Sequence, residues 1–184
     1  MKTQIDKNIK NIRVGLNWTS GREYSFDLDL SAFLLDEKDL ARSDEDFVFY
    51  NNHASVNEAL LFSGDDRSGM VDGTNESIYV DLEKIPEDIR KAVFCVTFDN
   101  AEEDYIFGEA ESIVLSASGV TDEFHKGDIA FFSVDLAKHC PQRSSMAVLE
   151  MSRCDEGWEY DMICDSADFG LLELCSRYGL AAEV

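Results

Sequence analysis

Apolar and polar residues alternate without a break in the segment Tyr24-Ser25-Phe26-Asp27-Leu28-Asp29-Leu30. Successive side chains of a β-strand point to opposite faces, so the apolar residues would share one face and Asp27 and Asp29 the other. The segment therefore predicts a strand that places one face on a hydrophobic core and two carboxylates on its other face.

Similar patterns recur along the whole chain. Further strands are expected over residues 9–16, 46–50, 59–63, 76–82, 92–98, 105–116, 127–135, 144–153 and 158–164. About ten short strands without alternating helices predict a mainly β fold, a two-sheet β-sandwich. Few prolines and no linker-like stretch interrupt the pattern, so residues 1–184 are expected to form a single domain.

Two helical pieces are expected beside the strands. Pro86 and the acids after it favour a short helical turn over 86–91. A C-terminal helix is expected over 168–178, with Gly179 as its terminator. Its apolar residues would form one stripe that packs on the sandwich: Phe169, Leu171, Leu172, Leu174 and Cys175.

Charge narrows the choice of partners. Sixteen Lys and Arg against 38 Asp and Glu give a formal net charge of −22, which repels phosphate backbones and anionic lipids. We therefore expect no nucleic-acid partner. We also expect no membrane insertion, since no run of 18 apolar residues is present. Five scattered cysteines are expected to be free thiols in a reducing cytoplasm.

Oxygen-bearing side chains crowd the segment 64–76, which also holds three glycines. Calcium takes six to eight hard oxygen ligands, and this loop together with the acidic strand could supply them. The candidate ligands are Asp27, Asp29, Asn51, Asp65, Asp66, Ser68, Asp72, Asn75 and Glu76. An EF-hand is excluded because Arg67 and Met70 occupy its third and sixth positions. A plain turn between strands is the alternative.

Other chemistries find little support. Three histidines are scattered, and the side chains of the adjacent pair His139-Cys140 are expected to diverge. No Cys-x-x-Cys pair, Gly-x-Ser-x-Gly elbow or Walker loop is present, so neither a zinc site nor an enzyme is expected.

A set of short motifs runs in order along almost the whole chain: Gly15-Leu16-Asn17-Trp18, Phe26 to Leu35, Asp46 to Asn52, Asn75-Glu76-Ser77, Phe107-Gly108, Gly157-Trp158, Gly170-Leu171-Leu172 and Tyr178-Gly179. In these motifs the chain resembles the TerD family of tellurite-resistance and chemical-stress proteins. The resemblance implies a two-sheet sandwich that binds calcium through the Asp-x-Asp strand and the acidic loop, usually as two neighbouring ions.

The chain departs from the family pattern at Gly73-Thr74-Asn75-Glu76, where the family commonly has Gly-Asp-Asp-Glu. Val71 replaces a frequent glycine, and Asp66 replaces the usual asparagine. Because affinity depends on charge count, we expect one well-kept calcium site and a second that is weakened or lost.

The sequence thus predicts a non-enzymatic, calcium-binding stress-response module. Calcium would tie the Asp27/Asp29 strand to the 64–76 loop and could regulate binding to other stress-response or TerD-like proteins. The alternative is an acidic interaction scaffold in which metal is only structural or absent.

Overall fold

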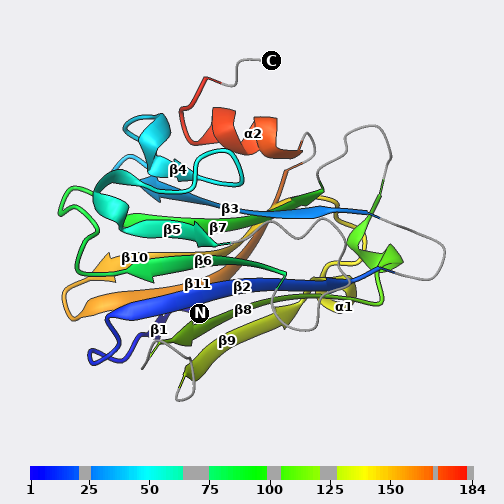
Figure 1. The fold of residues 1–184 in the computed structure, drawn as a ribbon, viewed down its shortest axis with the longest axis horizontal. Coiled ribbons are helices and arrows are strands. Elements are labelled where there is room, and N and C mark those ends of the chain that lie inside the picture. Colours follow the sequence, from blue (N-terminus) through cyan, green and yellow to red (C-terminus); the bar gives the residue numbers. More distant parts are fainter. Residues whose placement is uncertain (21–25, 64–74, 99–104, 121–127, 168–169, 182–184) are drawn as a thin grey trace.

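The computed structural model describes residues 1–20, 26–63, 75–98, 105–120, 128–167 and 170–181. Two antiparallel sheets are stacked face to face (Figure 1). The first sheet has six strands, in the order β1 (Thr3–Gln4), β11 (Gly157–Ser166), β10 (Met146–Cys154), β7 (Lys91–Phe98), β3 (Leu28–Leu35) and β4 (Phe47–Val48). The second has five, in the order β5 (Leu60–Ser63), β6 (Glu76–Asp81), β2 (Asn11–Thr19), β8 (Ser112–Gly119) and β9 (Ile129–Asp135).

These sheets confirm the predicted mainly β sandwich. Among the described residues two helices accompany them, α1 (Leu136–His139) and α2 (Gly170–Arg177), with single 3-10 turns at Asp44–Asp46, Val56–Glu58 and Phe107–Glu109. The short edge strand β1 was not expected from the sequence, because its two exposed residues carry no apolar pattern.

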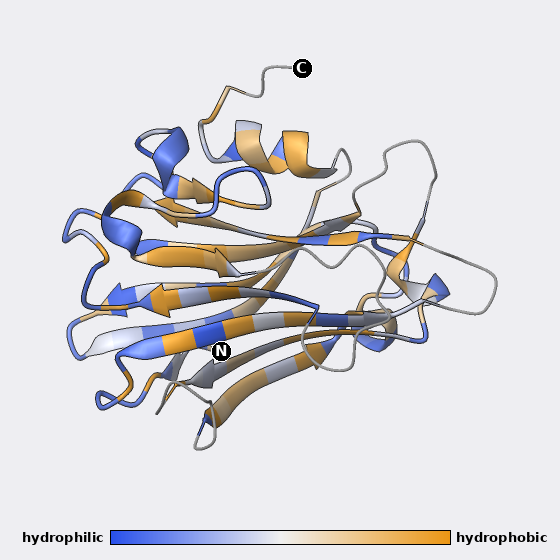
Figure 2. Ribbon diagram, viewed as in Figure 1, coloured by the Kyte–Doolittle hydropathy of each residue, from blue (hydrophilic) through white to orange (hydrophobic). Residues whose placement is uncertain are grey.

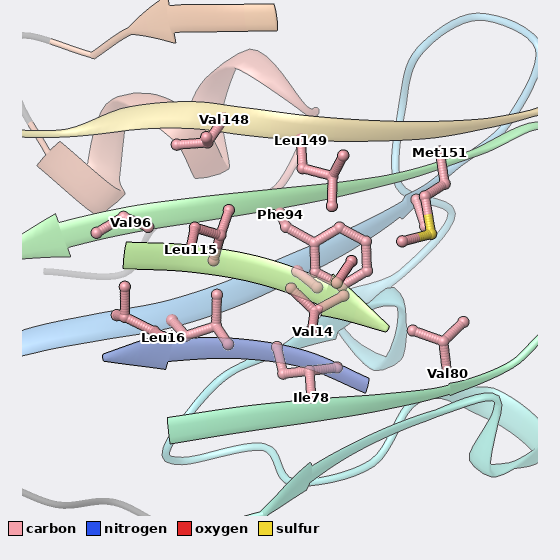
Figure 3. Packing of buried hydrophobic residues seen from close by; sticks show 14 of the residues in the cluster. Val14, Leu16, Ile78, Val80, Phe94, Val96, Leu115, Val148, Leu149 and Met151 are labelled. Atoms are coloured by element: carbon pink, nitrogen blue, oxygen red, sulfur yellow. The ribbon is translucent and has the colours of Figure 1, made fainter. Parts of the chain in front are cut away.

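The main core lies between the two sheets (Figure 3). The inward-facing side chains of β2, β6 and β8 meet those of β7 and β10, and these inward-facing side chains form a buried cluster. The labelled residues are Val14, Leu16, Ile78, Val80, Leu115, Phe94, Val96, Val148, Leu149 and Met151. Figure 2 shows apolar residues along the strands and hydrophilic residues in many of the connections between them. Burial of this alternating apolar face is the driving force for pairing the sheets.

A second, smaller core lies on the outer face of the six-stranded sheet, under α2 (Figure 1). Phe33 and Val93 of the sheet pack there with Leu174 of the helix. Strand β3 is therefore buried on both faces, and all eight of its residues are buried. The predicted core face of this segment is confirmed for Phe26, Leu28 and Leu30, whereas Tyr24 and Ser25 lie outside the described residues. The strand itself runs from Leu28 to Leu35, and its second half is apolar on both faces because α2 covers the outer one.

The end of α2 is determined by Gly179, as predicted. Gly179 has a φ of +82°, in the left-handed region that glycine adopts without strain. Leu180 N–H donates to Cys175 O at 2.9 Å, and Gly179 N–H donates to Ser176 O at 3.2 Å. This pair of bonds is a Schellman motif, which satisfies the last carbonyls of the helix.

Four local predictions need correction. The strand expected over 46–50 is the end of a 3-10 turn at Asp46 followed by the two-residue strand β4. Residues 86–91 form a single turn, in which Ile89 N–H donates to Pro86 O at 3.1 Å, and Lys91 already begins β7. The strand expected over 105–116 is a 3-10 turn followed by β8, shifted to Ser112–Gly119. Leu172, expected in the apolar stripe, is 51% exposed, because only one side of an eight-residue helix reaches the sheet. Within the described ranges, no helix combines the length and the apolar character needed to cross a membrane.

Candidate functional site

Two buried carboxylates come from opposite sheets at one end of the sandwich. Asp29 of β3 is 8% exposed and Glu76, the first residue of β6, is 1% exposed. Leu30 N–H donates to Glu76 Oε2 at 2.6 Å. The Glu76 carboxylate therefore crosses between the sheets and lies against the peptide that joins Asp29 to Leu30.

Asp27 and Asn75 flank these two acids along the chain. Asp27 is half-buried and precedes β3 by one residue. Asn75 is buried; its Oδ1 accepts a hydrogen bond from Trp18 N–H at 3.1 Å, and its own N–H donates to Leu16 O at 3.0 Å. These bonds continue the β2–β6 pairing by one residue, so they fix the point at which the 64–74 segment enters β6.

The other predicted ligands are not brought to these carboxylates by any described contact. Asn51 is exposed in the turn that Phe49 and Asn52 close with two backbone hydrogen bonds of 3.0 Å. No hydrogen bond between described residues joins Asn51 to Asp27, Asp29 or Glu76. The remaining predicted ligands, Asp65, Asp66, Ser68 and Asp72, lie outside the described residues.

The chemistry of this end of the sandwich suits a hard cation. Buried carboxylates lose hydration, and a cation with oxygen preference offsets that cost. In the part of the chain that the structure describes, Asp27, Asp29 and Glu76 do not by themselves converge as three ligands. A calcium site here therefore needs oxygens from the adjoining 64–74 segment.

A third buried carboxylate, Asp46, has a different partner. Arg42 donates from Nε to Asp46 Oδ2 at 2.8 Å and from Nη2 to Oδ1 at 2.7 Å. The Arg42 backbone N–H also donates to Oδ2, at 3.0 Å. The hydrogen bond to Asp46 raises the pKa of Arg42, and Arg42 in turn lowers the pKa of Asp88, which it also contacts. The buried Asp46 is therefore part of an internal ion pair with Arg42.

One group of potential ligands was missed at the sequence level. Ligand atoms of His139, Cys140 and Cys164 all lie within 4.8 Å of one another. The expectation that His139 and Cys140 diverge is wrong, because this pair ends helix α1 and does not lie in an extended strand. No spacing signal could have found the group, since Cys164 comes from the distant strand β11.

The fold is an antiparallel β-sandwich with acidic residues gathered where loops join its strands. The TerD domain family matches residues 2–178, and the chain therefore belongs to the TerD family. The family includes tellurium-resistance and stress-response proteins, as the relatives below show.

Curated relatives match almost the whole chain. The tellurium resistance protein TerD of Serratia marcescens is 31% identical over 95% of this chain and 90% of its own length. The uncharacterized protein YceE of Bacillus subtilis is 34% identical over 97% and 92%, and general stress protein 16U of the same organism is 29% identical over 97% and 92%.

Solved structures support the fold. A crystal structure of a protein of unknown function superimposes with a TM-score of 0.76, at 16% identity, over 94% of this chain and 97% of that one. A TerD homologue from Streptomyces coelicolor superimposes with a TM-score of 0.75, at 16% identity, over 91% and 95%.

Proposed function

We propose that this chain is a calcium-binding stress-response protein of the TerD family. In this proposal Ca²⁺ joins the start of β3, with Asp27 and Asp29, to the 64–76 loop that ends at Glu76. The observation that carries the proposal is the buried Glu76 carboxylate at the start of β6, which accepts the Leu30 N–H of the opposite sheet and so lies against the strand that carries Asp27 and the buried Asp29.

The donor set fits calcium better than softer ions. Carboxylates prefer hard cations, and Ca²⁺ accepts irregular sets of oxygen ligands that include backbone carbonyls and water. Asp65, Asp66, Ser68 and Asp72 would complete the set from the loop. The contacts of Asn75 with β2 support a positioning role for that residue, and the exposed turn around Asn51 offers no support for it as a ligand. One occupied site is therefore the core of the proposal, and a second would be weaker.

Binding would act through the fold and without catalysis. Calcium would cancel repulsion between the acids and stabilise the folded protein in proportion to its occupancy. Calcium held between β3 and the 64–76 loop could also control a surface through which other TerD-like or stress-response proteins bind. The five free thiols support a reducing, cytoplasmic setting for this activity.

Calorimetry on metal-stripped protein tests the calcium site. We expect heat of binding and a rise in melting temperature with Ca²⁺, and affinity at least about tenfold lower in Glu76→Gln and Asp29→Asn, since each removes one ligand charge. Glu37→Gln is the matched control, because this exposed acid just beyond the other end of β3 undergoes the same chemical change. No heat and no melting shift at millimolar Ca²⁺ would sink the proposal.

A pull-down in the presence and absence of chelator tests the regulatory half. Partners that bind only with Ca²⁺, and that Glu76→Gln fails to capture, support calcium control of the interaction surface. An identical partner set in both conditions would instead support the acidic scaffold with a structural metal.

A further inference from the structure

A compact group of one imidazole and two thiols lies away from the carboxylates. His139 is the exposed last residue of α1, Cys140 follows it, and Cys164 is on β11. Both cysteines are half-buried free thiols. Strands β10 and β7 separate β11 from β3 in the sheet, so this group is distinct from the proposed calcium site.

A β-bulge turns Cys164 into this position. The β10–β11 register pairs Ala147 with Asp165 and Leu149 with Met162, so Val148 alone faces both Ile163 and Cys164. Cys164 has a φ of +48°, which is unfavourable for a residue with a side chain. Bulges re-aim side chains: Ile163 packs in the core under α2, whereas Cys164 packs against the core between the sheets, as Cys140 does.

The end of α1 is held firmly on the other side of the group. Cys140 N–H donates to Leu136 O at 2.9 Å, and Arg143 N–H donates to Cys140 O at 3.0 Å. Gly108 N–H donates to Pro141 O at 2.9 Å, and a Cβ added to Gly108 would lie 2.9 Å from that same oxygen. This close approach fixes the crossover from β9 in one sheet to β10 in the other. The three ligands are therefore placed by the fold and not by exposed flexible chain.

We propose that His139, Cys140 and Cys164 bind one thiophilic metal ion of the Zn²⁺ class, with water in the fourth position. Zinc–sulfur bonds of about 2.3 Å in a tetrahedral site place two sulfurs about 3.8 Å apart. Ligand atoms within 4.8 Å of one another need to move by only about 1 Å, which side-chain rotation supplies. Two thiolates and one neutral imidazole balance the charge of a divalent ion, which suits a half-buried position. Calcium, which prefers oxygen, would not compete.

Binding exchanges protons for the metal. Each thiol loses its proton to solvent as its sulfur bonds the ion, so two protons are released for each ion bound. The bound ion would pin the sheet crossover to β11 and stabilise the fold.

Competition with a chromophoric zinc chelator, on fully reduced and metal-stripped full chain, tests this site. We expect one equivalent of Zn²⁺ per chain, and Co²⁺ in its place should show thiolate-to-metal charge-transfer absorption. His139→Ala and Cys140→Ser should each weaken binding at least about 100-fold, because loss of outer-shell partners alone costs 10–100-fold. His139 is exposed, so its variant should fold normally.

Cys154→Ser is the matched control. Cys154 is also a half-buried free thiol, but it lies at the far end of β10, where its Sγ contacts Gln4 Oε1 at 3.6 Å. Zinc affinity equal in the Cys140→Ser and Cys154→Ser proteins would overturn the proposal, as would full binding by His139→Ala. Glu76→Gln should bind Zn²⁺ like the parent, so failure of the calcium site and failure of this site are distinguishable.

Discussion

Asp46 and Glu76 are both buried carboxylates, but the fold holds them in different ways. Asp46 receives two guanidinium donors and a backbone donor from Arg42, four residues earlier in the chain. Glu76 receives the backbone N–H of Leu30 from the opposite sheet. The first contact shapes one loop, whereas the second ties the two sheets together beside Asp29. The contribution of Asp46, which is paired with Arg42, to stability should not depend on added cations. The contribution of Glu76, at the junction of the sheets, should depend on added Ca²⁺.

The largest effect is expected for Glu76→Ala. The variant removes the acceptor of the buried Leu30 N–H and leaves a cavity between the sheets, so we expect a loss of about 3 kcal/mol in the free energy of unfolding. Urea denaturation in chelator measures it.

Glu76→Gln separates the hydrogen bond from the charge. Its amide oxygen can still accept from Leu30 N–H, so most of the stability in chelator should return while the calcium response stays weak. Equal losses for both variants would show that the charge, and not the hydrogen bond, stabilises this junction.

A smaller loss is expected for Arg42→Ala. The variant leaves the buried Asp46 carboxylate without its charged partner. Because Arg42 is 28% exposed and solvent screens part of the cost, we expect a loss of about 2 kcal/mol in the free energy of unfolding. The loss should be the same in Ca²⁺ and in chelator, as measured by urea denaturation. A calcium-dependent loss would erase the contrast between the two acids.

The smallest expected effect is the contribution of the Cys164 thiol to the pH dependence of stability, in metal-free reduced protein. Its pKa is raised from 9.0 to about 11, chiefly by burial, so the folded form keeps a proton that the unfolded form loses. The contribution of this thiol to the free energy of unfolding is fully present below pH 9 and is lost as the pH rises through 11. Cys164→Ser should flatten the decline in unfolding free energy between pH 8 and 11 by less than about 1 kcal/mol, since the thiol is only half-buried. An unchanged slope would contradict the assignment.

The strands could be predicted because alternation of apolar residues is a local signal. The segment 26–30 shows it, and its apolar residues do face the main core. The boundaries of strands could be predicted less well. The prediction over 105–116 failed at Phe107, which is buried within a 3-10 turn, because a buried aromatic residue gives the same sequence pattern in a turn as in a strand. Helix α2 was predicted from its stripe and Gly179, but the exposure of Leu172 depends on how the helix lies on the sheet.

The candidate sites divide in the same way. Asp27, Asp29 and Glu76 could be chosen from the sequence because acids on a strand face and beside a glycine-rich loop are local features. The sequence by itself thus determined the sandwich and the family and singled out the acidic candidate ligands, since all three depend on neighbouring residues. Only the tertiary structure decided that Glu76 bonds the opposite sheet, that Asp46 pairs with Arg42, and that a bulge brings Cys164 to His139 and Cys140. The physical reason is that these contacts depend on register and chain crossing, which no local pattern encodes.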